Sequence, residues 1–195
     1  MKTQLLKTCN NSGRKMVSYE DVIEFWFKEI DPKKWFSKDV IFDGLVKDRF
    51  LSTYKAAQSS KLTEWRETPM GRLAEIIVLD QFPRNMFRDS ALAFSTDSLA
   101  LKNAQEAVGV NADQKLSPSE RAFLYMPFMH SEELKIHEEA IRLFSQTGLE
   151  NNLKFEILHK KIIERFGRFP HRNQILGRKS TSEELAFLKE PNSSF

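Results

Sequence analysis

Residues 68–85 read TPMGRLAEIIVLDQFPRN, a strongly apolar stretch with the pattern of a helix. Thr68 followed by Pro69 is typical of a helix start, because a threonine side chain caps free N–H groups and proline suits the first turn. Residues 73–79 are apolar except for Glu75, which predicts a central, buried helix. Pro83 is expected to end this helix, because proline lacks an N–H and disfavours helical geometry at Phe82.

Helix signals recur on both sides of this stretch, whereas strand signals hardly occur. Capping patterns predict helix starts, and glycine or proline predicts the ends. The expected helices begin at Ser18, Ser37, Thr68, Ser90, Ser117, Ser131, Asn151 and Thr181, with ends at Asp31, Pro83, Gly109, Pro127, Gly148 and Gly167. The chain is therefore predicted to be all-α, with roughly eight or nine antiparallel helices joined by short connections.

Composition supports a folded helical protein. The chain has 195 residues, of which 41% are apolar and 16 are Phe, so it has ample material for a core. Cys9 is the only cysteine, which favours a cytoplasmic location and excludes an internal disulfide. No apolar run has the length of a membrane span, so no membrane association is expected.

The pattern also predicts the domain limits. Residues 1–16 lack an apolar segment of signal-peptide length, and we expect them to form a disordered leader, with Met16 as an alternative start to Met1. Residues 17–190 are expected to form a single helical domain, and residues 191–195 a flexible tail. The oligomeric state cannot be deduced from these patterns.

Two segments of the sequence resemble each other. Residues 80–85 read DQFPRN with Arg88 beyond them, and residues 165–173 read RFGRFPHRN with Arg178 beyond them. Arginine binds carboxylate or phosphate bidentately, and free N–H groups after a helix break also favour an anion. Six residues are therefore candidate ligand-binding residues: Arg84, Asn85, Arg168, Arg172, Asn173 and Arg178. Alternatively, these arginines pair with Asp80, Glu132 or Glu164 and hold helix ends together.

Charge is unevenly distributed along the chain. Between Lys154 and Lys179 there are eight Lys and Arg residues and two acids, a net charge of +6, whereas the whole chain carries +3. The remainder must then carry +3 − 6 = −3. A basic C-terminal third attracts anions, although a run of charge is also typical of a solvated helix face.

Three histidines near these segments are candidate acid–base residues, namely His130, His159 and His171. Asp80 and Glu132 are candidate carboxylates that orient them. Glu133 and His137 have helical i, i+4 spacing but no third ligand in register, so neither a metal nor another cofactor is predicted. The aromatic residues have core spacing and no glycine-rich nucleotide motif occurs, so no nucleic-acid partner is expected.

Four segments in this order resemble the bacterial family known as domain of unknown function 924. They are Trp35-Phe36, residues 79–85 (LDQFPRN), residues 125–132 (YMPFMHSE) and residues 165–173 followed by Leu176-Gly177-Arg178. The resemblance covers about Ser18 to Leu188. It implies an all-helical array grouped by fold with tetratricopeptide-like proteins, and no established reaction.

Three hypotheses for function follow. In the first, a pocket binds a small anionic ligand that bears phosphate or carboxylate, and the histidines catalyse hydrolysis or group transfer on it. In the second, a non-catalytic tetratricopeptide-like scaffold binds an acidic peptide or another protein segment in a groove. In the third, the two motifs only hold helix ends together. The first hypothesis is supported if Arg84, Arg168, Arg172, His130 and His159 line one pocket, and it fails if the two motifs lie far apart on opposite faces.

Overall fold

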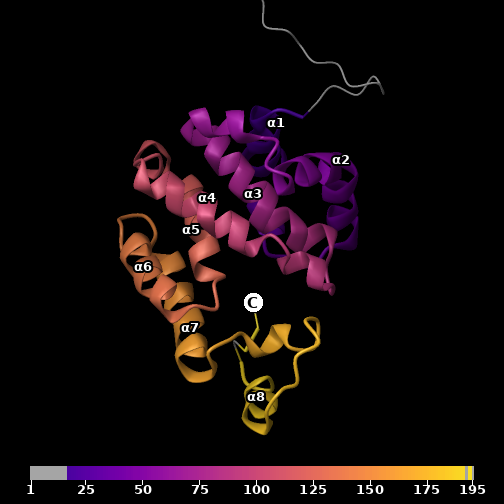
Figure 1. Ribbon diagram of the computed structural model, residues 1–195, viewed down its shortest axis with the longest axis vertical. Helices are drawn as coiled ribbons and strands as arrows, with labels where there is room; N and C mark the ends of the chain where they lie inside the picture. The colour runs from indigo at the N-terminus through magenta and orange to yellow at the C-terminus, as the bar shows by residue number, and fades with distance from the viewer. Residues whose placement is uncertain (1–16, 192, 195) are drawn as a thin grey trace, which may run out of the picture.

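The computed structural model describes residues 17–191, 193 and 194, and this part of the chain is helical without a strand (Figure 1). The predicted leader, residues 1–16, lies outside the described residues. The α-helices are α1 (Tyr19–Glu24), α2 (Val40–Gln58), α3 (Pro69–Met86), α4 (Asp97–Gly109), α5 (Pro118–Met129), α6 (Leu134–Phe144), α7 (Glu150–Phe166) and α8 (Ser182–Phe187). The all-α prediction is confirmed.

Helix α3 is the central element of the fold, as its sequence predicts. It packs against α1, α2, α4 and α5, and every residue from Leu73 to Pro83 is buried. Burial of Glu75 is compatible with this position because Arg66 forms a two-pronged ion pair with its carboxylate, at 2.7 and 2.9 Å. In Figure 1, α3 lies between α2 and α4.

The prediction that Pro83 ends this helix is wrong. Helix α3 continues through Pro83 to Met86. Proline removes the N–H that would bond to the carbonyl of Leu79, four residues earlier. The hydroxyl of Thr96 donates to that carbonyl oxygen at 2.6 Å, so the buried acceptor has a partner. A tertiary contact therefore compensates for the backbone hydrogen bond that Pro83 removes.

Pro127 is likewise inside a helix rather than at its end. Helix α5 continues to Met129, and His130 is its C-terminal cap residue. This places His130 on the last turn of α5 and not in a loop after a break. Arg84 and His130 therefore lie within a helix and at a helix cap, respectively, and not in loops that follow helix breaks.

Other predicted boundaries also differ from the structure. The helix expected to start at Ser131 begins at Leu134 as α6, with Glu133 as its N-cap residue. Asp39, not Ser37, caps α2 and accepts hydrogen bonds from the N–H groups of Ile41 and Phe42. Ser90 caps only the short 3₁₀ helix η4 (Ala91–Phe94), and α4 begins at Asp97. At the end of α4, Asn111 adopts the left-handed conformation (φ 56°) that Gly109 was expected to adopt.

The remaining capping predictions are confirmed where the pattern is complete. Ser18, Ser117 and Thr181 each form a reciprocal capping box with the acid three residues later. Thr68 caps α3 with Pro69 in the first turn. Gly167 ends α7 with φ 67°, a left-handed conformation that glycine adopts more readily than any other residue.

The second Phe-Pro pair lies just after a helix, because α7 has already ended at Gly167. Phe169 is extended, and Pro170 begins the 3₁₀ helix η6 (Pro170–Arg172). Phe169 packs with Ile162, Ile163 and Phe187 in a small cluster separate from the main core. Arg168 also forms an ion pair with Glu184, at 2.6 Å, which attaches α8 to this end of the molecule.

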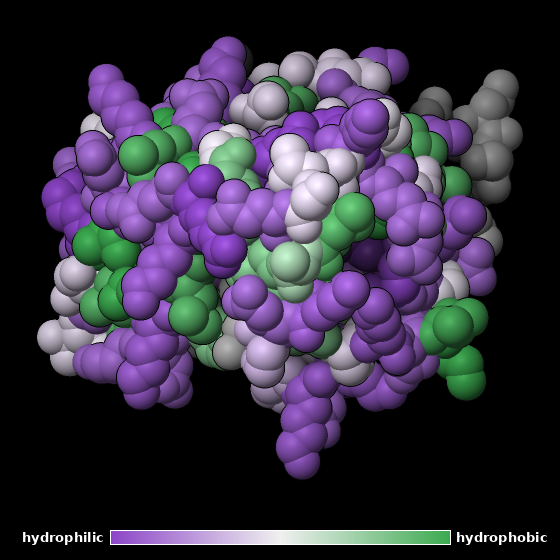
Figure 2. Space-filling model, turned by 90° about the horizontal axis from the view of Figure 1, so that it is seen from below, coloured by the Kyte–Doolittle hydropathy of each residue, from purple (hydrophilic) through white to green (hydrophobic). Residues whose placement is uncertain are grey.

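The molecular surface at the α8 end is mostly hydrophilic, and its hydrophobic residues form separate patches (Figure 2). Within the described part of the chain, no helix combines the length and the apolar character needed to cross a membrane.

Candidate functional site

A cavity of about 540 Å³ lies where η4, α4, the end of α5 and η6 meet. Phe94, Asp97, His130, Glu132 and Arg172 line it, so the second sequence segment and the His130 segment meet there. The apolar part of the lining includes Leu101 of α4 and Leu176. A volume of this size accommodates a small molecule.

Asp80 and His130 form a hydrogen-bonded pair at this site. Nδ1 of His130 lies 2.8 Å from Oδ1 of Asp80, and the amide of Gln81 donates to Oδ2 at 2.5 Å. Asp80 is only 1% exposed, so its carboxylate is held away from solvent. Because the carboxylate accepts from Nδ1–H, the neutral ring carries its lone pair on Nε2. No described residue forms a hydrogen bond with Nε2.

The charge states of this pair follow from burial and from Arg84. Burial opposes ionisation of Asp80, but Arg84 and His130 outweigh it and hold the pKa of this carboxyl below its usual range. Burial, reinforced by the Arg84 cation, lowers the pKa of His130 below 6.5. Near neutral pH the pair is therefore a carboxylate and a neutral imidazole, the combination that a general base requires.

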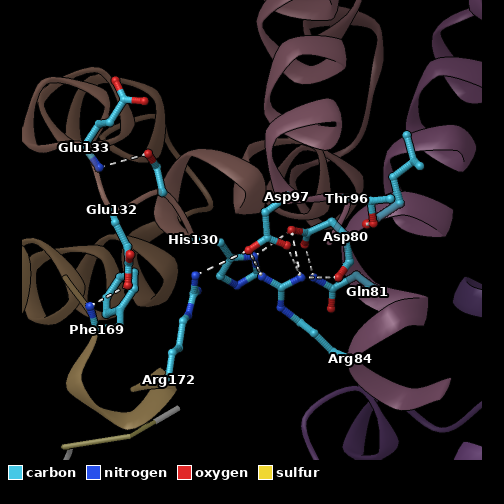
Figure 3. A network of polar contacts seen from close by, with 12 residues as sticks. Asp80, Gln81, Arg84, Thr96, Asp97, His130, Glu132, Glu133, Phe169 and Arg172 are labelled. Carbon is cyan, nitrogen blue, oxygen red and sulfur yellow. Dashed lines mark hydrogen bonds and ion pairs between the residues drawn. The ribbon is translucent and has the colours of Figure 1, made fainter. Parts of the chain in front are cut away.

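Asp97 joins two of the predicted arginines. Arg84, from α3, binds the Asp97 carboxylate in two-pronged geometry at 2.9 and 3.0 Å. Arg172, from η6, approaches the same carboxylate at 3.4 Å. Figure 3 shows both arginines pointing toward Asp97 beside the Asp80–His130 pair. Arg84 also lies 3.3 Å from Oδ1 of Asp80, so these four side chains and His130 form one network.

Arg172 makes fewer of the hydrogen bonds seen in this structure than the two other arginines of the network, Arg84 and Arg178. It is 6% exposed, and its guanidinium lies 4.6 Å from the ring centres of both Phe94 and Phe169. Its buried Nε has no partner among the described residues. Burial and the nearby Arg84 cation lower its pKa to about 10, so it remains protonated at neutral pH. Arg172 can therefore donate to a molecule in the cavity.

Glu132 lines the cavity, but its carboxylate oxygens already accept hydrogen bonds from other residues of this chain. It accepts hydrogen bonds from both terminal nitrogens of Arg178, at 2.6 and 3.0 Å, and from the N–H of Phe169 at 2.8 Å. Burial raises the pKa of Glu132, but the Arg178 hydrogen bonds outweigh this and keep it below the usual range. Glu132 and Arg178 together hold the η6 segment against the turn that follows α5.

His159 and His171 lie near the site without lining the cavity. Nδ1 of His159 donates to the carbonyl of Phe155 at 2.8 Å, and its ring contacts Phe169 edge-on. Burial lowers the pKa of His159 to about 3 and that of His171 to about 4. Both are therefore neutral near pH 7 and pack around Phe169.

Three predicted ligand-binding residues have partners away from the cavity. Asn85 donates to Asp43, which also binds Arg88 in two-pronged geometry. Arg168 binds Glu184. Asn173 is buried and donates to Ser180 at 3.1 Å. Of the five residues that were to line one pocket, His130 and Arg172 line the cavity, whereas Arg84, Arg168 and His159 do not. The two motifs nevertheless meet, because Arg84 and Arg172 bind the same Asp97 carboxylate.

The arginine cluster is accompanied by an equal number of carboxylates. Arg84, Arg172 and Arg178 face Asp80, Asp97 and Glu132, so their formal charges cancel. The charge of the basic segment is partly offset in the same way, since Arg165 and Arg168 pair with Glu183 and Glu184. Preference for an anion therefore depends on the free donors of Arg172 rather than on net charge.

Sequence reasoning missed Asp97 and Thr96. An acidic residue in the first turn of a helix is ordinary, because it complements the helix dipole, so Asp97 carried no distinguishing signal. The buried pair His137–Glu156 was also missed, with Nδ1 and Oε1 2.7 Å apart. In the described part of the chain, no group of three or more His, Cys, Asp or Glu residues has metal-binding geometry.

The comparisons with known proteins agree with the fold. The family model described as "Bacterial protein of unknown function (DUF924)" matches residues 22–192. The chain belongs to the DUF924 family. The solved structure of a protein of unknown function from Agrobacterium tumefaciens is 42% identical, with a TM-score of 0.84, over 88% of this chain and 96% of that one. A comparison with curated proteins gave no match.

Proposed function

We propose that the cavity binds a small molecule bearing phosphate or carboxylate, and that His130 transfers a proton in a reaction of that molecule. The observation that carries this proposal is the shared location of two groups. His130, ordered by Asp80 and with Nε2 unbonded by any described residue, lines the same cavity as Arg172. A base and an anion-binding donor around one cavity form the minimum set for hydrolysis or group transfer.

In this proposal Arg172 donates to the anionic group, and Phe94 and Phe169 keep its guanidinium in position. Nε2 of His130 accepts a proton from water or from a hydroxyl of the second substrate as the oxygen attacks the carbonyl or phosphoryl centre. Asp80 stabilises the imidazolium that results, and the same proton can then pass to the leaving group. Asp97 binds both Arg84 and Arg172 and offsets the repulsion between the two cations.

The alternative of a scaffold that binds an acidic peptide along the arginines has less support. Arg84, Arg168 and Arg178 each bind a carboxylate of this chain in two-pronged geometry. A peptide carboxylate would have to displace these partners. We further propose that residues 17–190 form a single domain and that the protein acts in the cytoplasm.

A thermal-shift screen of phosphorylated and carboxylated metabolites tests the proposal. A ligand present at about 100 times its Kd stabilises the folded state by about 2.7 kcal/mol, which corresponds to a Tm increase of about 5–10 °C in a chain of this size. We expect this increase in the wild type and its loss in Arg172→Gln. Arg168→Gln is the matched control, because its arginine pairs with Glu184 outside the cavity.

Compounds that bind are then assayed for turnover with His130→Gln. We expect this variant to keep the ligand-induced shift and to lose about 10²–10⁴-fold in kcat, the usual contribution of a general base. If no compound distinguishes the wild type from Arg172→Gln, the ligand proposal fails. If bound compounds turn over equally in His130→Gln, the proposed role of His130 fails.

A further inference from the structure

A second surface, away from the cavity, combines exposed apolar side chains with lysines. Phe36, Val40, Ile41 and Leu45 are exposed to 72%, 87%, 87% and 49%, respectively. Val40, Ile41 and Leu45 lie on one face of the first turns of α2, and Phe36 lies just before that helix. Single exposed apolar residues are ordinary, but four that are this close in sequence and on one helix start mark an interaction surface.

Lysines surround this apolar face. An open hollow of about 580 Å³ is lined by Lys33, Lys34, Lys38, Val40 and Ile41, with Ser37 and Asp39. Lys34 forms an ion pair with Asp39, whereas Lys33 and Lys38 have no ion pair among the described residues. With three lysines and one aspartate, the lining carries a formal charge of +2.

The segment that carries this surface is held in place before anything binds. The indole N–H of Trp35 donates to the carbonyl of Trp26 at 2.9 Å, and Phe36 stacks on Phe123 with ring centres 6.3 Å apart. Asp39 caps α2 and binds Lys34 at the same time. A preformed surface avoids the ordering cost that weakens docking by flexible segments.

We propose that this surface, residues 33–45, docks an acidic, apolar-containing peptide segment of a protein partner. Carboxylates of the partner would meet Lys33 and Lys38, and an apolar side chain would lie against Val40 and Ile41. The positive charge of the lining favours an acidic partner over a second copy of this chain. In a symmetric dimer formed through this surface the same lysines would face each other, which opposes self-association.

The arrangement of charge also favours a peptide over a membrane surface. A peptide can place its acids beside Lys33 and Lys38 and a neutral side chain beside Asp39, whereas anionic headgroups would cover all three residues. The interaction does not depend on the α4–α5 cavity, so its success or failure is separate from that of the proposed function.

Fluorescence polarisation with synthetic peptides tests this proposal. The probes are labelled peptides of about 12 residues that combine Leu or Phe with Glu or Asp, and the same peptides with Lys in place of each acid. We expect the acidic set to bind the full chain and the basic set not to bind. The double variant Lys33→Glu/Lys38→Glu should reverse this preference, and Ile41→Ser should weaken acidic binding by about tenfold or more.

The matched control is Leu185→Ser, which removes an apolar side chain of 53% exposure from α8 and should leave acidic binding unchanged. The substituted side chains are exposed, so all variants should keep the wild-type Tm. The proposal is overturned if no acidic peptide binds, or if the charge reversal leaves the preference unchanged. It is also overturned if Ile41→Ser abolishes a wild-type dimer in analytical ultracentrifugation, or binding to phosphatidylserine vesicles, while peptide binding persists.

Discussion

At the scale of single residues, the protonation of His130 is set by two neighbours of opposite charge. Asp80 stabilises the imidazolium through a direct hydrogen bond, and Arg84 disfavours it. Burial adds to the effect of Arg84, and the balance lowers the pKa of His130. The two neighbours should therefore shift this pKa in opposite directions when their charges are removed.

We predict that Asp80→Asn lowers the pKa of His130 further and that Arg84→Gln raises it. NMR titration of the His130 ring resonances measures both. Each variant serves as the control for the other, because a general loosening of the site would increase hydration of His130 and raise its pKa in both variants. Shifts of the same sign would contradict the electrostatic explanation.

A second residue-scale prediction concerns the carbonyl of Leu79. In Thr96→Val this buried acceptor loses its partner, and we expect a loss of about 1–3 kcal/mol in the free energy of unfolding by urea denaturation. In a Pro83→Ala background, the alanine N–H can bond to Leu79 again. Thr96→Val should then cost clearly less, and an equal cost in both backgrounds would show that the hydroxyl does not compensate for Pro83.

At the scale of elements, the start of α2 shows which of two neighbouring residues, Ser37 or Asp39, caps the helix. Asp39 accepts from the N–H groups of Ile41 and Phe42, whereas the hydroxyl of Ser37 donates to the carbonyl of Lys34. Only Asp39 has the extended backbone and the acceptor position of a cap.

Asp39→Ala should therefore reduce the free energy of unfolding by about 1 kcal/mol, because two N–H groups at the start of α2 lose their acceptor. Ser37→Ala should change it by less than about 0.5 kcal/mol, as for other exposed substitutions. Chemical denaturation of the two variants measures the difference. A larger loss for Ser37→Ala would restore the boundary predicted from the sequence.

At the scale of the whole molecule, buried neutral histidines make stability depend on pH. The pKa values of His159 and His171 fall to about 3 and about 4 in the folded state. In the unfolded chain these groups titrate near 6.5. Between these values the unfolded state binds more protons than the folded state. The stability that the two neutral histidines contribute is therefore fully present above about pH 6.5 and is lost as the pH falls.

At pH 5 each of the two histidines should cost about 1–2 kcal/mol of unfolding free energy relative to pH 7. His159→Phe removes one titrating group and should flatten the decline between pH 6.5 and 4, whatever its effect on stability at pH 7. Urea denaturation at a series of pH values measures this. Parallel curves for the wild type and the variant would contradict the assignment.

Much of the helical fold could be predicted from local sequence. Complete capping boxes at Ser18, Ser117 and Thr181 and the left-handed glycine at Gly167 act within one turn of backbone, so their residues specify the boundary directly. The apolar run of α3 predicted its central position, because a helix that is apolar on all faces is stable only when it is buried. The prediction failed at Pro83, where the tertiary contact from Thr96 replaces the lost hydrogen bond, and at Pro127, through which α5 also continues.

The sequence by itself determined which side chains could carry chemistry. Asp80 and Arg172 were identified from residue type and from their place in the two motifs, and His130 and Glu132 from the segment 125–132. Only the tertiary structure decided which of them meet. Asp97 and Thr96 lie on other elements than α3, and no local pattern distinguishes an acid that pairs with Arg84 from one that faces solvent. Ion pairing depends on distances between elements, which packing of the core sets.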